Sequence, residues 1–147
     1  MTTTKPWVFF YGSYMNFDVL KEVDYVPEQF EVAKVNGFDI LIQPRADMIR
    51  SDRHCVYGIL ATATHAELDR LYARTQSVFG HTYLPEAVLA ETLSGSFVPA
   101  LCYIAPSMEG GPAANDYVDR IVKPAREFNF PGWYIERLES FRSDNER

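Results

Sequence analysis

Two short strand-like segments on either side of Asn36 and Gly37 constrain the fold of this chain most strongly. Residues 30–35 alternate apolar and polar side chains, and residues 38–43 are again rich in apolar ones. Asn-Gly between two such runs is the strongest short-range signal for a β-hairpin. Because a hairpin joins antiparallel strands, this pattern argues against a doubly wound parallel sheet and favours a mixed or antiparallel one.

The remaining periodicities predict mostly strands, with helices inserted late and between strands. Apolar segments predict strands over residues 7–11, 55–63, 83–91 and 97–105, and residues 92–96 are typical of a turn. Residues 45–53 are polar and predict a loop. Helical patterns occur in residues 17–23, 64–74, 115–124 and 130–141. This order predicts an α+β fold, in which a small mixed β-barrel carries peripheral helices.

Individual residues refine these elements. Thr64 and Glu67 have the spacing of a capping box at the start of a helix. Asn115 or Asp116 is expected to cap the next helix, and Pro124 to kink it. A glycine within a strand, Gly58, indicates a bulge or a close approach of another backbone segment.

Length and charge restrict the classes of function. The chain has 147 residues, which fits a single domain, and its formal net charge is −6. Binding to nucleic acid or to an anionic membrane needs a basic face, so we expect neither partner. No segment approaches the roughly 18 apolar residues of a membrane span. The first seven residues lack the apolar stretch of a secretory signal, which favours the cytoplasm.

The chain offers few candidates for metal or cofactor chemistry. Cys55 and Cys102 lie in predicted strands at a spacing that matches no metal site, and we interpret them as buried free thiols in a reducing compartment. The histidines occur at turns or helix starts, where an exposed polar role is the ordinary one. Phosphate loops, zinc spacings and nucleophile elbows are absent from the sequence. We therefore expect no metal and no cofactor.

The first predicted strand ends abruptly at Gly12 and Ser13, ten residues from the N-terminus. Successive N–H groups at such a corner can form a concavity that binds anions. The missing Cβ of Gly12 lets a ligand or another strand approach closely. From the residues alone, a plain strand-to-turn corner and a binding site both remain open.

Four segments in order resemble the γ-glutamylcyclotransferase-like family, which has an AIG2-like or BtrG-like fold. "FFYGSYMN" resembles the family's first strand and loop, and residues 45–71 resemble a polar loop, a Tyr-Gly strand and a Leu-Asp helix. "YLPEAVLAE" is similar to the strand that follows, and "FPGWYIERLESF" to the C-terminal helix. The likeness extends over about residues 7–141 of a single domain, 1–147.

The resemblance implies a small mixed β-barrel and an activity on γ-glutamyl amides. In the family's reaction the substrate's α-amino nitrogen attacks its own γ-carbonyl, which releases 5-oxoproline and an amine without metal or cofactor. The resemblance also implies a small-molecule γ-glutamyl partner held by the loop of Tyr11, Gly12, Ser13, Tyr14 and Met15. Tyr117 and Tyr134 match tyrosines near the family's pocket, and packing between helix and barrel is the alternative for both. Tyr72 is a further candidate, which either binds substrate as a hydrogen-bond donor or packs in the core.

The chain departs from the family at its general acid/base. The resemblance places a glutamate four residues after Leu68, where this chain has Tyr72. A phenol, with a pKa near 10, is a poor base at neutral pH. Glu86 is the first candidate for a displaced catalytic carboxylate, provided that it faces the barrel interior. Arg45 and Asp47 are candidates for a loop ion pair or for the rim of the pocket.

Three functions remain open at this point. The first is a γ-glutamylcyclotransferase that acts through a displaced base, and the second is a catalytically inactive module that binds small molecules. The third is a protein-interaction domain that uses exposed aromatic residues of segment 130–141. The sequence leaves the substrate and the oligomeric state open.

Overall fold

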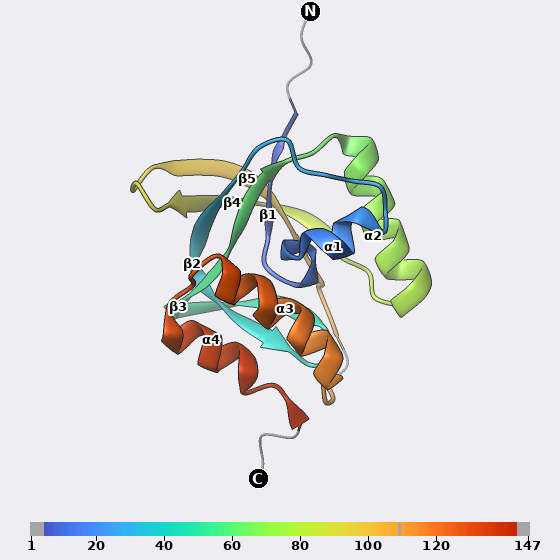
Figure 1. Cartoon of the computed structure of the whole chain (residues 1–147), viewed down its shortest axis with the longest axis vertical. Coiled ribbons are helices and arrows are strands. Elements are labelled where there is room, and N and C mark those ends of the chain that lie inside the picture. The colour runs from blue at the N-terminus through green and yellow to red at the C-terminus, as the bar shows by residue number, and fades with distance from the viewer. Residues whose placement is uncertain (1–4, 109, 144–147) are drawn as a thin grey trace, which may run out of the picture.

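The structure is a computed structural model that describes residues 5–108 and 110–143 (Figure 1). In this part of the chain five strands form a closed barrel in the order β1-β3-β2-β4-β5. Neighbouring strands are antiparallel except β1 and β5, whose parallel contact at Val8 and Leu101 closes the barrel. The predicted mixed barrel is therefore confirmed. Its strands are β1 (Trp7–Phe10), β2 (Phe30–Ile42), β3 (Ala46–Thr62), β4 (Leu84–Thr92) and β5 (Phe97–Ile104).

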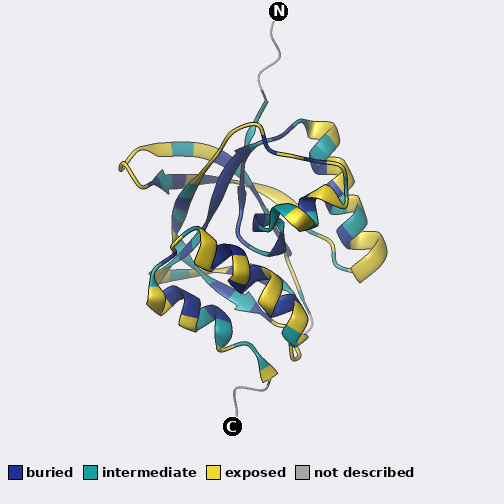
Figure 2. Ribbon diagram, in the orientation of Figure 1, coloured by how far each residue is buried: buried dark blue, intermediate teal, exposed yellow. Residues whose placement is uncertain are grey.

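Helices surround the barrel, as the α+β prediction requires. Figure 1 shows α3 and α4 side by side below the barrel and α1 and α2 to its right. Buried residues concentrate in the barrel strands and on the helix faces turned toward them (Figure 2). None of the helices in the described residues is long and apolar enough to cross a membrane. The helical elements are η1 (Ser13–Met15), α1 (Phe17–Lys21), α2 (His65–Phe79), α3 (Asn115–Glu127) and α4 (Gly132–Glu139).

The predicted hairpin at Asn36-Gly37 is wrong, and so is the polar loop over residues 45–53. Strand β2 continues through this dipeptide, with a register irregularity between Asn36 and Phe38 and a φ of 87° at Gly37. The chain reverses only at residues 43–45, after which Ala46 pairs with Ile42. Polar residues of the expected loop form the first half of β3, because backbone pairing with β2 needs no apolar side chain there.

Gly58 of β3 confirms the expected close approach. A Cβ on this residue would lie 2.2 Å from the carbonyl oxygen of Phe10 and 2.8 Å from the ring of Phe9. Strand β1 therefore packs directly over the backbone of β3. This contact fixes the end of β1, from which the Gly12-Ser13 corner emerges.

The ends of α2 and α3 differ in how well they were predicted. The Thr64–Glu67 capping box is present, with Thr64 Oγ1 accepting from Glu67 N at 3.0 Å and Glu67 Oε1 accepting from Thr64 N at 2.8 Å. The predicted side-chain cap of α3 is wrong, because Ala114 is the capping residue and makes no side-chain hydrogen bond. Asn115 instead accepts from the backbone N–H of Ser143.

Pro124 lies inside α3, which continues to Glu127. Proline has no N–H, so the carbonyl of Arg120, four residues earlier, loses its helical donor. The side-chain amide of Asn16 donates to this carbonyl at 3.2 Å. The bond ties α3 to the residue that follows η1.

Candidate functional site

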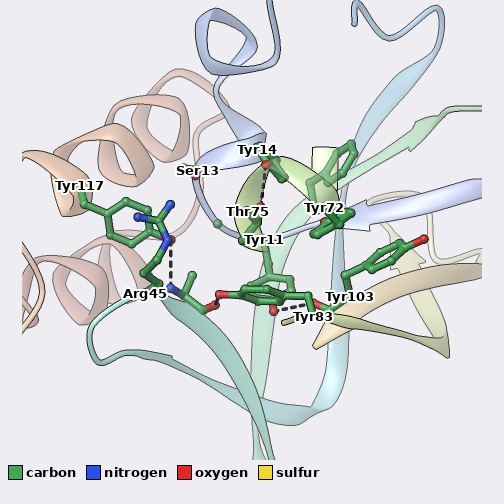
Figure 3. A pocket seen from close by; sticks show the side chains of 12 residues that line it. Tyr11, Ser13, Tyr14, Arg45, Tyr72, Thr75, Tyr83, Tyr103 and Tyr117 are labelled. Atoms are coloured by element: carbon green, nitrogen blue, oxygen red, sulfur yellow. Dashed lines mark hydrogen bonds between the residues drawn. The ribbon is translucent and has the colours of Figure 1, made fainter. Parts of the chain in front are cut away.

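A pocket lies where β1 leaves the barrel, between η1, α2 and α3 (Figure 3). It is narrow: the centre of a water molecule can move within about 40 Å³, and the surrounding empty space of about 380 Å³ includes open solvent. Tyrosines dominate its wall, so we call it the tyrosine pocket. It is lined by Phe10, Tyr11, Gly12, Ser13, Tyr14, Arg45, Ala46, Tyr72, Thr75, Tyr83, Tyr103 and Tyr117.

The Gly12-Ser13 corner contributes free backbone donors to this wall. Met15 N donates to Gly12 O at 3.0 Å and closes the single turn of η1. Within the described residues, no acceptor is found for the amides of Gly12, Ser13 and Tyr14. The first N–H groups of a helical turn point away from it and lack internal partners. These three amides are therefore available to a ligand.

The absence of a side chain at Gly12 allows a close contact with strand β3. A Cβ built on Gly12 would lie 2.9 Å from the Cβ of Ala46. Ala46 N also donates to the Tyr117 hydroxyl at 3.0 Å, and Ala46 O accepts from the Tyr83 hydroxyl at 2.5 Å. The start of β3 thus holds the Gly12 loop and two of the pocket's tyrosines in place.

Three of the six tyrosines that line the pocket donate their hydroxyl hydrogen to a backbone carbonyl of the protein. Tyr11 donates to Tyr103 O at 2.7 Å, and Tyr14 donates to Leu71 O at 2.7 Å. Burial raises the pKa of Tyr11, Tyr14 and Tyr83, so these groups stay protonated at neutral pH. They shape the pocket and do not take protons from a ligand.

Tyr72 packs inside the aromatic wall. Its ring stacks on that of Tyr103, with centroids 3.9 Å apart and planes inclined by 10°, and meets Tyr14 edge-on at 5.5 Å. Burial raises the pKa of Tyr72 well above its ordinary value. In the structure Tyr72 is therefore a neutral hydrogen-bond donor and a poor base.

Arg45 stands at the turn between β2 and β3 and forms the pocket's cationic edge. Its Cζ lies 3.7 Å from the ring centroid of Phe79 and 4.1 Å from that of Tyr117. Asp47 does not pair with it: Asp47 Oδ1 accepts from Met48 N at 2.9 Å and from Ala105 N at 3.0 Å. Of the two interpretations of Arg45 and Asp47, the ion pair is wrong, and Arg45 lies at the pocket.

Glu86 lies in a second, more open hollow, which we call the outer hollow. It measures about 930 Å³ including solvent at its mouth, and its lining includes Glu86, Asp47 and Arg45. Glu86 lies on the same side of β4 as the buried Val88 and Ala90, yet it is itself exposed. It does not line the tyrosine pocket. Its role as a base stays a prediction.

Comparison with solved structures assigns the fold. A structure titled "Gamma-glutamyl cyclotransferase" superposes with a TM-score of 0.79 at 20% identity, covering 92% of this chain and 87% of that one. The chain has the γ-glutamyl cyclotransferase fold. An uncharacterized human protein matches with a TM-score of 0.82 at 20% identity, covering 94% of this chain and 88% of its own.

A mouse protein described as AIG2-like shares the γ-glutamyl cyclotransferase fold, with a TM-score of 0.58 at 16% identity over 73% of this chain and 81% of that one. A search of protein-family models found no match. No curated protein sequence matches either. These likenesses support the predicted architecture and leave substrate and activity to be argued from the site.

The γ-glutamyl cyclotransferase fold brings most of the predicted site residues together, but not all of them. Met15 is buried in the core, and Tyr134 packs on Tyr57 from α4, with ring centroids 5.2 Å apart. Neither lines the tyrosine pocket, because each points from its helix toward the barrel core. The predicted residues that do line it are Tyr11, Gly12, Ser13, Tyr14, Tyr72 and Tyr117.

Sequence reasoning missed five residues of the pocket wall. Tyr83 and Tyr103 come from the entrance to β4 and the end of β5, and only the strand pairing shows that they meet. Thr75 lies one helical turn beyond Tyr72 and bonds to the Tyr14 hydroxyl at 2.8 Å. Helical spacing from Tyr72 was the signal that could have identified Thr75. Of the remaining two, Ala46 lay in the expected loop and Phe10 in the first predicted strand.

The cysteines and the C-terminal aromatics take no part in this pocket. Cys102 is buried and Cys55 is partly exposed, and both thiols are free. In segment 130–141, Trp133 is exposed, whereas Phe130 and Tyr134 are buried. The interaction-domain hypothesis therefore depends on Trp133 and stays a prediction.

The Asp47 carboxyl makes the stability of the protein depend on pH. Burial raises its pKa above the usual range, although the amides of Met48 and Ala105 act against this rise. The Asp47 carboxyl therefore binds its proton more tightly in the folded state than in the unfolded chain. As a result, the free energy of unfolding falls as the pH rises past about 3.9, the pKa of an aspartate in the unfolded chain. Asp47→Asn keeps an oxygen acceptor and removes the charge.

We expect Asp47→Asn to be more stable than the wild type in urea unfolding at pH 7. The advantage should shrink at pH 3, below both pKa values, where the wild-type carboxyl is protonated in both states. An equal difference in free energy of unfolding at the two pH values would show that the charge of Asp47 is not the cause.

Proposed function

We propose that the protein binds a small γ-glutamyl compound, or a related amino-acid amide, in the tyrosine pocket. The observation that carries this proposal is the chemistry of the wall: free amides at Gly12, Ser13 and Tyr14, a cation at Arg45, and no carboxylate among the described lining residues. A wall of hydrogen-bond donors recognises acceptors, such as carboxylate and amide oxygens.

A γ-glutamyl head presents both kinds of acceptor. Its α-carboxylate can accept from two or three backbone amides, and its γ-carbonyl oxygen lies a few bonds away. The sequence resemblance and a solved structure titled "Gamma-glutamyl cyclotransferase" point to the same head group. The aromatic rings of the wall can cover the aliphatic carbons between the two acceptors.

Binding without turnover is the outcome that the wall favours. Cyclisation needs a group that takes a proton from the α-ammonium and one that returns it to the leaving amine. Tyr72 occupies the position that the resemblance gives to a glutamate, and its raised pKa keeps it protonated. The described lining contains neither a carboxylate nor a histidine. The bound γ-glutamyl compound would therefore be released unchanged.

A cyclotransferase that uses Glu86 is the second candidate, and one observation favours it. Glu86 shares its side of β4 with the inward-facing Val88 and Ala90, and its hollow adjoins the tyrosine pocket at Arg45. This candidate requires the γ-glutamyl chain to bring its ammonium to the outer hollow. It predicts 5-oxoproline release that Glu86→Gln abolishes.

Isothermal titration with γ-L-glutamyl-L-alanine, together with chromatography for 5-oxoproline, tests both candidates. Saturable binding with the dipeptide recovered intact supports the binding function. Release of 5-oxoproline that depends on Glu86 supports the second candidate. Absence of both binding and turnover would contradict a γ-glutamyl ligand.

Gly12→Ala is expected to weaken binding of this dipeptide by about tenfold or more, a loss of about 1.4 kcal/mol. The added Cβ would lie 2.9 Å from Ala46, so the loop must shift and its amides lose their alignment with the ligand. Titration of the variant measures the effect. Gly132→Ala is the matched control, because a Cβ there meets nothing within 4 Å and the residue lines neither the tyrosine pocket nor the outer hollow. Equal affinity in Gly12→Ala and wild type would rule out the loop amides as the binding groups.

A further inference from the structure

Within the described part of the chain, Arg45 has no anionic partner at the edge of the tyrosine pocket. Among the described residues no carboxylate forms an ion pair with it, although the chain as a whole carries a net charge of −6. The nearest acidic residue in sequence, Asp47, is occupied by the amides of Met48 and Ala105. In an acidic protein, a guanidinium left unpaired beside a pocket is available to an anionic ligand.

Two aromatic rings hold this guanidinium in place. The ring centroid of Phe79, at the end of α2, lies 3.7 Å from the Cζ of Arg45. The ring centroid of Tyr117, in α3, lies 4.1 Å from the same atom. Contacts of this kind use the faces of a cation and leave its N–H edges free for hydrogen bonds. Because the rings come from two different helices, the group is oriented before any ligand arrives, and less entropy is lost on binding.

The charge of Arg45 acts on the tyrosine pocket and not on the carboxyl of Asp47. It lowers the pKa of Tyr14, Tyr83 and Tyr117, against the larger rise that burial causes in each. The shift at Asp47 arises from burial, from two backbone amides and from Glu86. Figure 3 shows Arg45 beside Tyr117 at the edge of the pocket.

Arg45 is also shared between the tyrosine pocket and the outer hollow. A γ-glutamyl compound whose α-carboxylate lies on the Gly12–Tyr14 amides must direct its other end out of the narrow pocket. The guanidinium stands at the boundary that this end would cross. The part of the ligand beyond the γ-amide is therefore the part that Arg45 can contact.

From these positions we infer that Arg45 is a specificity-determining residue, which selects γ-glutamyl amides whose amine portion carries a carboxylate. The inference rests on the proposed γ-glutamyl binding and adds the chemistry of the second half of the ligand. The guanidinium pairs with that carboxylate, and amides of neutral amines lack this contact. Specificity of this kind is a ratio of affinities and is measured as one.

Two probes isolate the second carboxylate. γ-L-Glutamyl-L-alanine and γ-L-glutamylethylamide share the glutamyl head and the amide, and differ only in the carboxylate on the amine portion. In isothermal titration we expect the wild type to bind the dipeptide at least about tenfold more tightly, and the ratio to fall as salt is added. In Arg45→Met the ratio should fall to about one, with affinity for the ethylamide little changed.

Arg53→Met is the matched control. Arg53 is also on β3, but it is exposed and lines neither the tyrosine pocket nor the outer hollow. It should keep the wild-type ratio. Arg45→Lys keeps the positive charge but loses the planar guanidinium, which can donate two parallel hydrogen bonds to a carboxylate. Its ratio of affinities for the two probes should lie between those of the wild type and Arg45→Met.

Equal binding of the two probes by the wild type, or an unchanged ratio in Arg45→Met, would overturn the role of Arg45 and leave γ-glutamyl binding intact. Failure of the wild type to bind either probe would overturn the proposed function itself. Thermal unfolding of each variant confirms that the titrated protein is folded. Loss of folding in Arg45→Met would leave the ratio in Arg45→Lys as the deciding measurement.

Discussion

Gly58→Ala is expected to remove most of the protein's free energy of unfolding, by about 4 kcal/mol or more. The new Cβ would lie 2.2 Å from Phe10 O, a backbone atom, and 2.8 Å from the Phe9 ring. A flexible side chain could turn away, but a backbone carbonyl in a barrel strand moves only with its strand. Separating β1 from β3 would open the barrel at the strand that leads to the tyrosine pocket.

Urea unfolding, followed by circular dichroism, measures this effect against Gly132→Ala. Gly132 begins α4, and a Cβ there meets nothing within 4 Å, so the control should differ from wild type by less than about 1 kcal/mol. A loss below about 1.5 kcal/mol in Gly58→Ala would mean that β1 can shift without opening the barrel. Because natural domains have only about 5–15 kcal/mol to lose, a failure to accumulate folded protein is also an expected result.

Local signals in the sequence predicted the elements whose geometry is set locally. The capping box of Thr64 and Glu67 involves four consecutive residues, so no distant contact could alter it. Asn36-Gly37 was expected to reverse the chain, and this prediction is wrong, although Gly37 does have a positive φ. Strand β2 pairs with β3 on both sides of this dipeptide and therefore stays continuous. The dipeptide causes only a register irregularity between Asn36 and Phe38.

The candidate site likewise combines residues that local sequence identifies with residues that only the fold brings together. The Tyr11–Tyr14 corner and Tyr72 could be identified from a resemblance of short segments, each of which is local. The positions of Tyr83 and Tyr103 depend on the pairing of β4 with β5, which no single segment encodes. Arg45 reaches the pocket because the hairpin reverses at residues 43–45 and not at the Asn-Gly signal of residues 36–37.

The unpaired state of Arg45 is likewise a property of the assembled fold. Sequence alone placed it two residues from Asp47, and an ion pair was a natural interpretation. The structure shows Asp47 bonded to Ala105 at the end of β5, a contact across 58 residues. Long-range pairing thus decides which charges are neutralised and which remain free for a ligand.

If the wild type binds without turnover, as proposed, Tyr72→Glu is expected to give the protein γ-glutamyl cyclotransferase activity. The substitution supplies a carboxylate at the position that the resemblance assigns to the general acid/base. A carboxyl group in this largely buried aromatic wall would have a raised pKa, which brings it closer to the range of a base at neutral pH. General acid–base catalysis contributes about 10²–10⁴-fold, so release of 5-oxoproline from γ-L-glutamyl-L-alanine should become measurable.

Tyr72→Gln is the control that separates the charge from the change of shape. Both variants lose the stacking of Tyr72 on Tyr103, and both leave the pocket with a similar volume, but only the glutamate can accept a proton. We expect the two variants to bind the dipeptide with comparable affinity and only Tyr72→Glu to turn it over. If both bind and neither turns over, a missing base is not what keeps the wild type inactive. Turnover already present in the wild type, and lost in Glu86→Gln, would instead assign the proton transfer to Glu86 and leave Tyr72 a packing role.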